Sequence, residues 1–300
     1  MACAVLGVKS RIQRKEITLS MSKYKLIALD FDGTLANSQG EITERTKEAV
    51  HRVAQTDATI VVATGRRFFT AKPRVMQLEL PEVLIAGHNG AILKQLNGEL
   101  LHHQLLPRNV AHNAVKIAKE LGVCPIVFEG TQDAANLLVE DYGIRIDAWQ
   151  RSYLQENEQF LCWVDNLSTD LPGDVIEVIC AVSEGEVHQL ARTFQQRLDG
   201  QVKPIIWTVA EWQLAFIGLS SPKATKREPL RYLAEQMQID RSEILAIGDN
   251  YNDLDMLYFA GTGIIMANAE SPLRQMGFHV TASNDEDGVA VALEGFVLVN

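Results

Sequence analysis

Short apolar segments of strand length recur along the chain, and polar residues follow several of them directly. Each segment is nearly continuous rather than alternating, which is typical of strands that are covered on both faces of a parallel sheet. The predicted strands are Leu26 to Asp30, Ile60 to Thr64, Val83 to Gly87, Ile244 to Gly248 and Gly263 to Met266. The sequence therefore predicts a sheet whose strands are far apart along the chain.

The segment between the first two predicted strands has the periodicity of a helix. Thr43 can cap this helix at its start. Four apolar residues then share one helical face, namely Ala49, Val50, Val53 and Ala54. A strand, a helix and a second strand in this order form a βαβ unit. We therefore predict an α/β fold with a doubly wound, Rossmann-like parallel sheet.

The alternation of strands and helices stops after the third strand and returns near Thr225. The segment between contains both helical and strand-like patterns, at 110–121, 175–182, 184–198, 205–209 and 214–218. The predicted organisation is thus an N-terminal extension without order (1–22), a catalytic core in two pieces (23–90 and 218–300) and an inserted α+β cap (91–217).

Composition places the chain among ordinary globular proteins, with 47% hydrophobic and 22% charged residues. No apolar run approaches the roughly 20 residues that a membrane-spanning helix needs. The net charge of −10 argues against a nucleic-acid or membrane partner. The four cysteines form no CxxC pair, so we expect reduced thiols and a cytoplasmic protein. We expect a monomer or a weak homo-oligomer.

Polar clusters follow three of the predicted strands. Asp30 and Asp32 lie at the end of the first strand, residues 64–66 at the end of the second, and the polar residues 248–253 at the end of the fourth. Ligands of open α/β sheets bind outside the carboxyl ends of the strands, so the three clusters should converge on one rim. Two carboxylates two residues apart at such a rim suggest a nucleophile and a proton carrier beside a metal ion.

Four motifs in this order resemble the haloacid dehalogenase superfamily, and within it the Cof-type phosphatases with a large inserted cap. They are DFDGT at 30–34, ATGR at 63–66, a lysine at a helix start near 226, and GDNYND at 248–253. The resemblance extends over residues 23 to 300. It implies a Mg²⁺-dependent phosphomonoesterase whose mobile cap closes over a small phosphorylated metabolite.

The resemblance also implies a role for each aspartate. Asp30 would attack phosphorus and form an aspartyl-phosphate, which divides one difficult displacement into two steps. Asp32 would protonate the leaving group and later activate water. Asp249 would complete the Mg²⁺ site with the Asp30 carboxylate and the backbone carbonyl of Asp32, and Asp253 would support these ligands.

Further residues are assigned to the phosphate and the substrate. Thr64, Gly65 and Asn252 would hydrogen-bond phosphate oxygens, and Asn89 would border the substrate. Lys226 would be the phosphate-binding cation, because residues 230–235 resemble the family helix that follows this lysine, and Pro229 supports its place at the mouth of that helix. Lys223 is the alternative lysine. Arg66 and Arg67 are suited equally to a phosphate and to surface ion pairs.

Sugar phosphates are the first substrate class that the resemblance suggests, followed by phosphorylated cofactors such as flavin or pyridoxal phosphates. A phosphomutase or a sucrose-phosphate-type phosphatase on the same core is the alternative with similar chemistry. A non-catalytic sensor of a phosphorylated ligand is the alternative from another class, although a sensor has no need for an acid/base carboxylate at Asp32.

Overall fold

The computed structural model describes residues 22–130, 137–141, 153–209 and 214–298. The predicted N-terminal extension therefore lies outside the described residues, except for Ser22. Contacts within the chain divide it into two compact units, formed by residues 1–86 with 226–300 and by residues 87–225. The boundaries of the predicted core and cap stay a prediction.

The first unit is built on parallel strands. They pair in the order β14-β13-β12-β1-β2-β3, and every pairing in this series is parallel. The bounds are β1 Leu26–Asp30, β2 Thr59–Ala63, β3 Leu84–Gly87, β12 Ile244–Gly248, β13 Thr262–Ile265 and β14 His279–Val280. The predicted doubly wound α/β fold is confirmed. Strand β1 lies between β2, which precedes the second unit in the sequence, and β12, which follows it.

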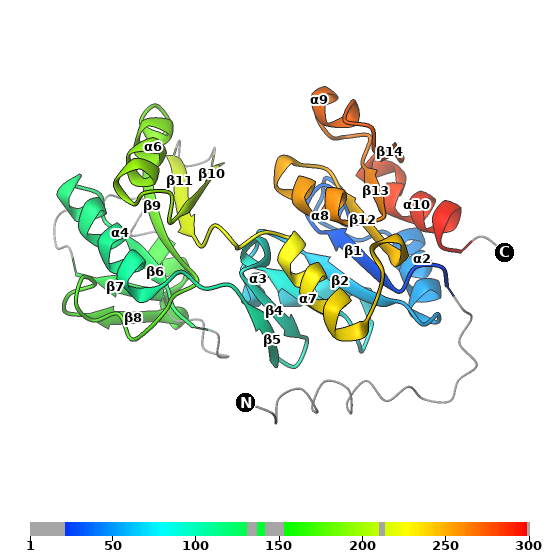
Figure 1. The fold of residues 1–300 in the computed structure, drawn as a ribbon, viewed down its shortest axis with the longest axis horizontal. Helices are drawn as coiled ribbons and strands as arrows, with labels where there is room; N and C mark the ends of the chain where they lie inside the picture. The colour runs from blue at the N-terminus through cyan, green and yellow to red at the C-terminus, as the bar shows by residue number, and fades with distance from the viewer. Residues whose placement is uncertain (1–21, 131–136, 142–152, 210–213, 299–300) are drawn as a thin grey trace. The chain divides into compact units, whose positions relative to one another are not determined.

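Helices pack in pairs on the sheet of the first unit. Helix α2 (Glu44–Ala54) packs beside α10 (Gly288–Phe296), and α7 (Arg227–Met237) packs beside α8 (Leu254–Phe259), as Figure 1 shows. The chain leaves β1 toward β2 and leaves β12 in the opposite direction toward β13. Right-handed crossovers therefore place α2 and α8 on opposite faces of the sheet. The short helices α3 (Phe68–Val75) and α9 (Ser271–Arg274) complete this unit.

The predicted elements of the first unit match the structure closely. Two strands, β1 and β12, have the predicted bounds, and the other three differ by one residue. Thr43 caps α2 by accepting a hydrogen bond from the Thr46 backbone N–H at 3.2 Å. Placing Ala54 on the buried face was wrong, because Ala54 is exposed and Thr46 is buried instead. The buried side chains follow an i, i+3, i+4, i+7 pattern from Thr46, and Ala54 lies beside this stripe.

The second unit contains a mainly antiparallel sheet in the order β10-β11-β9-β6-β7-β8, in which β7 and β8 are parallel. Strands β4 and β5 of this unit also pair in antiparallel fashion. The bounds are β4 Ile92–Gln95, β5 Leu100–His103, α4 Arg108–Glu120, β6 Ile126–Phe128, β7 Leu137–Glu140, β8 Leu161–Val164, β9 Glu177–Ser183, α6 Val187–Arg197, β10 Lys203–Val209 and β11 Leu214–Ser220. The predicted α+β character of this segment is confirmed.

Two differences in the second unit have local causes. The predicted strand over 175–182 begins later, at Glu177, because Val175 instead forms an isolated bridge with Leu106. The predicted strand over 205–209 begins earlier, at Lys203, and includes Pro204. Strand β10 is at the edge of its sheet, where a proline is tolerated because its missing N–H can face away from the neighbouring strand.

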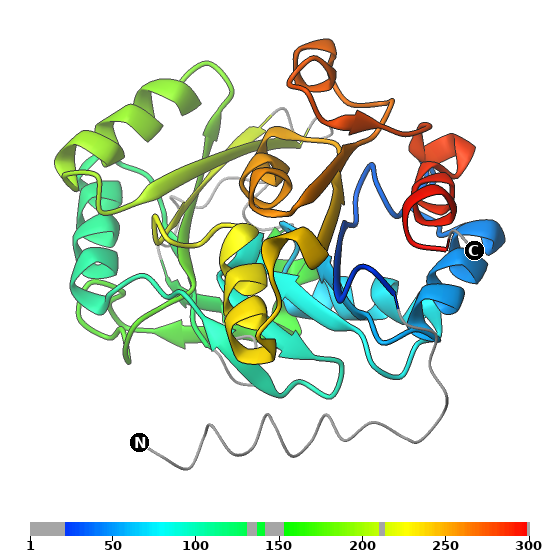
Figure 2. The same ribbon diagram turned by 45° about the vertical axis from the view of Figure 1, so that its right-hand side comes forward.

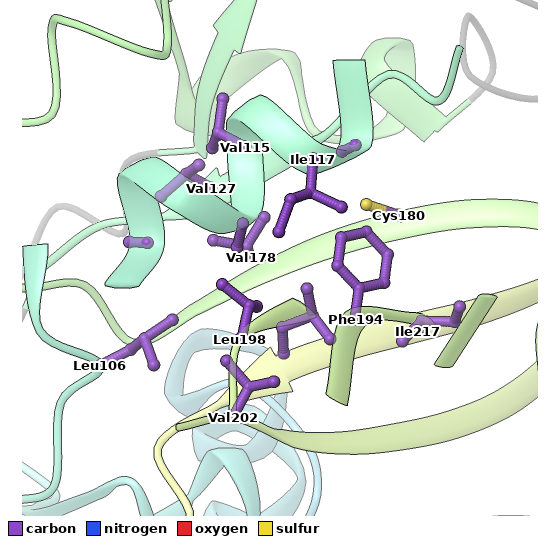
Figure 3. Packing of buried hydrophobic residues seen from close by; sticks show 14 of the residues in the cluster. Leu106, Val115, Ile117, Val127, Val178, Cys180, Phe194, Leu198, Val202 and Ile217 are labelled. Carbon is purple, nitrogen blue, oxygen red and sulfur yellow. The ribbon is translucent and has the colours of Figure 1, made fainter. Parts of the chain in front are cut away.

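The core of the second unit lies between its sheet and the helices α4 and α6. Figure 3 shows side chains from both helices meeting those of β9 and β11, with Phe194 of α6 close to Cys180 of β9. Phe194 is fully buried, and Cys180 is 1% exposed. In the view of Figure 2, α4 and α6 can be followed along the same side of this sheet. This segment therefore has a hydrophobic core of its own.

Burial predicts very different reactivities for the cysteines of the second unit. Burial raises the pKa of Cys180 to about 12, so little thiolate is present at neutral pH. Cys162 is exposed on β8. With a thiol-reactive probe at neutral pH, we expect Cys162 to be labelled rapidly and Cys180 only after unfolding. Mass spectrometry of the digested protein checks this, and rapid labelling of Cys180 in the native protein would contradict the packing described.

Candidate active site

The loop after β1 brings the DFDGT motif to the carboxyl end of the sheet. The loop is closed by two backbone hydrogen bonds, from the Leu35 N–H to the Asp30 carbonyl at 3.2 Å and from the Ala36 N–H to the Phe31 carbonyl at 2.9 Å. Gly33 takes a left-handed φ of +78°, which a residue with a Cβ adopts only with strain. This turn reverses the chain while Asp30 stays buried at the strand end.

Lys226 lies directly before helix α7, and its ammonium group contacts two carboxylates. Its Nζ donates to Asp30 Oδ1 and to Asp253 Oδ1, each at 2.5 Å. The side chains of Lys226 and Asp253 are fully buried, and that of Asp30 is 7% exposed. The structure thus brings together three of the predicted site residues from the ends of β1 and β12 and the start of α7.

Asp253 also binds the loop that follows β12. Its Oδ2 accepts hydrogen bonds from the backbone N–H groups of Asp249 at 3.0 Å and of Asn250 at 2.9 Å. Gly248 makes this approach feasible, because a Cβ at this position would lie 2.6 Å from the Asp253 Cβ. The Asp253 carboxylate therefore fixes the backbone that carries Asp249, in addition to its contact with Lys226.

Asp249 completes a cluster of three carboxylates. Oxygen atoms of Asp30, Asp249 and Asp253 lie within 4.8 Å of one another, a spacing that could hold a metal ion. Thr34 donates its hydroxyl to Asp249 Oδ1 at 2.9 Å and so orients this carboxylate. Asp253 is already engaged by Lys226 and two N–H groups, so Asp30 and Asp249 are the two carboxylates best placed to bind a cation directly.

The charges of this cluster are unbalanced. Burial raises the pKa of Asp30 well above its ordinary value; Lys226 lowers it, and the negative charges of Asp253 and Asp249 raise it further. Burial and the charge of Asp253 likewise raise the pKa of Asp249. Burial alone would lower the pKa of Lys226, but the adjacent carboxylates of Asp253 and Asp30 outweigh it and raise this pKa. Lys226 therefore keeps its proton, and the surplus negative charge favours a divalent cation.

The end of β2 contributes Thr64 and Arg66. Thr64 is fully buried, and its hydroxyl accepts a hydrogen bond from the Arg66 N–H at 3.1 Å. The Arg66 guanidinium pairs with Asp32 through Nε at 2.6 Å and through an η nitrogen at 2.5 Å. Of the two alternatives for Arg66, the structure therefore shows an ion pair, and its partner is the predicted acid/base residue.

The remaining predicted residues are placed as follows. Gly65 is exposed in the loop after β2, and Asn252 is exposed in a short 3-10 helix after β12. Asn89 belongs to the second unit, is partly buried and has a left-handed φ of 53°. Lys223 is exposed and also belongs to the second unit, whereas Lys226 contacts the acidic cluster. The geometry thus favours Lys226 of the two lysines.

Asn268 and Asn284 were missed by the sequence interpretation, and both bind the loop after β1. Asn268 Nδ2 donates to the Gly33 carbonyl at 2.8 Å, and its Oδ1 accepts from the Asn284 N–H at 3.0 Å. Asn284 in turn donates to the Ala36 carbonyl at 3.0 Å. No local pattern marks either residue, because the bonds to the β1 loop join positions more than 230 residues apart.

Gly33 offers a direct test of how this cluster is built. A Cβ at position 33 would lie 2.5 Å from Asp249 Oδ2, so Gly33→Ala should displace the Asp249 carboxylate as well as strain the backbone. We expect turnover and the affinity for a divalent cation to fall about 10- to 100-fold, the range seen when groups around metal ligands are altered. Steady-state kinetics over a range of Mg²⁺ concentrations measures both.

Gly122→Ala is the matched control for this variant. Gly122 has nearly the same φ, +75°, but nothing lies within 4 Å of the added Cβ. Both variants therefore carry the backbone strain, and Gly33→Ala alone should alter the metal dependence. Equal kinetics for the two variants would contradict the contact with Asp249.

Comparisons with known proteins identify the family. The family model of haloacid dehalogenase-like hydrolases matches residues 27–293, so the chain belongs to this family. Phosphatase YwpJ of Bacillus subtilis is 28% identical over 284 residues, covering 89% of this chain and 97% of its own. A crystal structure of a haloacid dehalogenase-like hydrolase from Bacteroides thetaiotaomicron has a TM-score of 0.74 and 29% identity, covering 91% of this chain and 99% of that one.

A further relative carries a more specific name. The 5-amino-6-(5-phospho-D-ribitylamino)uracil phosphatase YitU of Bacillus subtilis is 27% identical over 277 residues, covering 92% of this chain and 98% of its own. These findings support a hydrolase that acts on phosphate esters. Among the residues that the structure describes, no helix is both long and apolar enough to cross a membrane.

Proposed function

We propose that the protein is a Mg²⁺-dependent phosphomonoesterase that hydrolyses a small phosphorylated metabolite through an aspartyl-phosphate at Asp30. The observation that carries this proposal is the buried contact of Lys226 with Asp30 and Asp253, with Asp249 beside them. A structural ion pair would need one carboxylate for one lysine. Three carboxylates around one ammonium group suit a site that also binds a cation and transfers a phosphoryl group.

The proposed reaction has two steps. A carboxylate oxygen of Asp30 attacks phosphorus, the bond to the leaving oxygen breaks, and Asp32 gives its proton to that oxygen. Asp32 then accepts a proton from water as the water oxygen attacks phosphorus, and the bond to Asp30 breaks. The products are the free alcohol and inorganic phosphate. The half-exposed side chain of Asp32 is suited to this exchange with water.

The residues present fit a magnesium ion. Mg²⁺ prefers hard oxygen ligands, one or two carboxylates from the protein and the oxygens of a substrate phosphate. Asp30 and Asp249 would supply the carboxylates, with the backbone carbonyl of Asp32 as a third ligand. When bound, the ion would offset the negative charge of the cluster and of the phosphate. Lys226, whose Nζ donates to Asp30, would bind the phosphate together with Thr64, Gly65 and Asn252.

Sugar phosphates are the first substrate class in this proposal. The relative named as a ribitylaminouracil-phosphate phosphatase acts, by its name, on a phosphorylated sugar alcohol joined to a pyrimidine. The phosphorylated sugar alcohol in this name is close in chemistry to the first substrate class expected from the sequence, the sugar phosphates. Action in the cytoplasm is also part of the proposal, supported by the free thiols of Cys162 and Cys180.

The test is phosphate release from a panel of esters, with Mg²⁺ and with a chelator. The panel contains hexose and pentose phosphates, nucleoside monophosphates, flavin mononucleotide, pyridoxal phosphate, phosphoribitylaminouracil and p-nitrophenyl phosphate. We expect release from a few members, lost with the chelator and restored by Mg²⁺. Isomerised sugar phosphate without release would indicate a mutase, and ligand-induced thermal stabilisation without any turnover would indicate a sensor. Either result would overturn the proposal.

A further inference from the structure

The Asp32 carboxylate has a single side-chain partner in the described part of the chain, the guanidinium of Arg66. Both carboxylate oxygens are engaged, Oδ2 by Nε at 2.6 Å and Oδ1 by an η nitrogen at 2.5 Å. Two parallel bonds of this kind fix the plane of a carboxylate as well as its distance. The side chain of Asp32 is 49% exposed, so packing contributes little to its orientation.

Arg66 itself is fixed to the sheet. Its backbone N–H donates to the buried Thr64 hydroxyl, and the Thr64 N–H donates to the Ala86 carbonyl of β3 at 2.9 Å. Strands β1 and β2 are neighbours, with Asp30 paired to Ala63 in the parallel register. The guanidinium therefore reaches from the end of β2 to the loop after β1 and holds Asp32 from a rigid base.

We propose that Arg66 is a positioning residue for proton transfer, which acts on the reaction through Asp32 and not through the phosphate. This inference rests on the proposed function. The sequence left Arg66 open between phosphate binding and a surface ion pair, and the inference gives this ion pair a role in the reaction. An exposed ion pair contributes little to the stability of the fold. We therefore assign the Arg66–Asp32 pair to the orientation of the Asp32 carboxylate. Loss of this orientation should slow only those steps in which Asp32 donates or accepts a proton.

Leaving groups of different basicity distinguish positioning of Asp32 by Arg66 from binding of the phosphate by Arg66. An alkyl phosphate releases a strongly basic alkoxide and needs the proton of Asp32 in the first step. p-Nitrophenyl phosphate releases a stable phenolate and does not. The ratio kcat/KM reports the steps up to formation of the aspartyl-phosphate, so the later hydrolysis of this intermediate does not obscure the comparison.

The experiment compares Arg66→Gln and Arg66→Lys with the wild-type protein in Mg²⁺. The two substrates are p-nitrophenyl phosphate and the primary alkyl phosphate with the highest kcat/KM in the panel. We expect Arg66→Gln to lower kcat/KM for the alkyl ester about 10- to 100-fold, part of the 10²- to 10⁴-fold that general acid catalysis supplies. For p-nitrophenyl phosphate we expect little change in kcat/KM, because its phenolate leaves without a proton from Asp32.

Arg66→Lys should lie between these values for the alkyl ester, because an ammonium group keeps the charge but not the paired donors. Arg52→Gln, at an exposed arginine on α2, is the matched control and should behave as the wild type with both esters.

Equal losses with both esters would overturn the inference and assign Arg66 to the phosphate. Unchanged kinetics of Arg66→Gln with both esters would also overturn it, because the Arg66–Asp32 contact would then be a surface ion pair without a role in the reaction. Failure of the proposed function would differ, since the wild type itself would then release no phosphate.

Discussion

Asp30→Asn should abolish turnover while leaving the protein folded. The amide cannot serve as the nucleophile, and removal of a catalytic nucleophile costs several powers of ten, so we expect kcat to fall at least about 10³-fold. The fold should persist, because the amide oxygen of the variant can still accept a hydrogen bond from Lys226. Loss of one of the crowded negative charges also relieves repulsion from Asp249 and Asp253. Phosphate release and thermal unfolding of the same preparation measure the two effects.

Asp199→Asn is the matched control for this prediction. Asp199 is an exposed aspartate of the second unit with a left-handed φ of 49°, a conformation that asparagine also tolerates. Its substitution should leave turnover and the unfolding midpoint at their wild-type values. A well-folded Asp30→Asn variant with full activity would exclude Asp30 as the nucleophile.

Lys226→Met should have the largest effect on stability. The change removes the ammonium group that two buried carboxylates contact and leaves their charges uncompensated. Breaking a buried charge pair from one side costs about 3 to 5 kcal/mol. Protonation of Asp30, whose pKa is already raised, should place the loss toward the lower end of this range. Denaturant unfolding in a chelator measures the decrease, and phosphate release should be lost as well.

Magnesium should restore part of the stability of Lys226→Met, because a divalent cation replaces the missing positive charge among three carboxylates. We therefore expect Mg²⁺ to raise the free energy of unfolding of this variant more than that of the wild type. Lys223→Met is the control, since Lys223 is exposed and is the other lysine near this helix. A larger loss of activity in Lys223→Met than in Lys226→Met would show that the wrong lysine has been assigned.

The fold could be predicted to a large extent because its strands are continuous apolar runs with polar residues at their ends. Strands β1 and β12 have the predicted bounds for this reason, since all their side chains are buried. Pro229, in the first turn of α7, was a local feature that supported the position of Lys226 directly before this helix. Such features depend on neighbours along the chain, which the sequence displays directly.

The parts of the site that could not be predicted depend on contacts between distant residues. The sequence left Arg66 open between two roles, and its partner became clear only when the ends of β1 and β2 were placed side by side. Asn268 and Asn284 support the β1 loop from the other end of the chain and belong to no recognisable pattern. Thr34 stands in the DFDGT motif, but its bond to Asp249 crosses 215 positions.

The measurement that tests the central claim most directly is chemical trapping of the aspartyl-phosphate. The protein is mixed with p-nitrophenyl phosphate and Mg²⁺, quenched in acid during turnover and reduced with borohydride, which converts an aspartyl-phosphate into homoserine. Mass spectrometry of the digested protein then locates the change. The account predicts homoserine at position 30, absent without substrate and absent in Asp30→Asn. Homoserine at another aspartate, or turnover that never modifies Asp30, would contradict it.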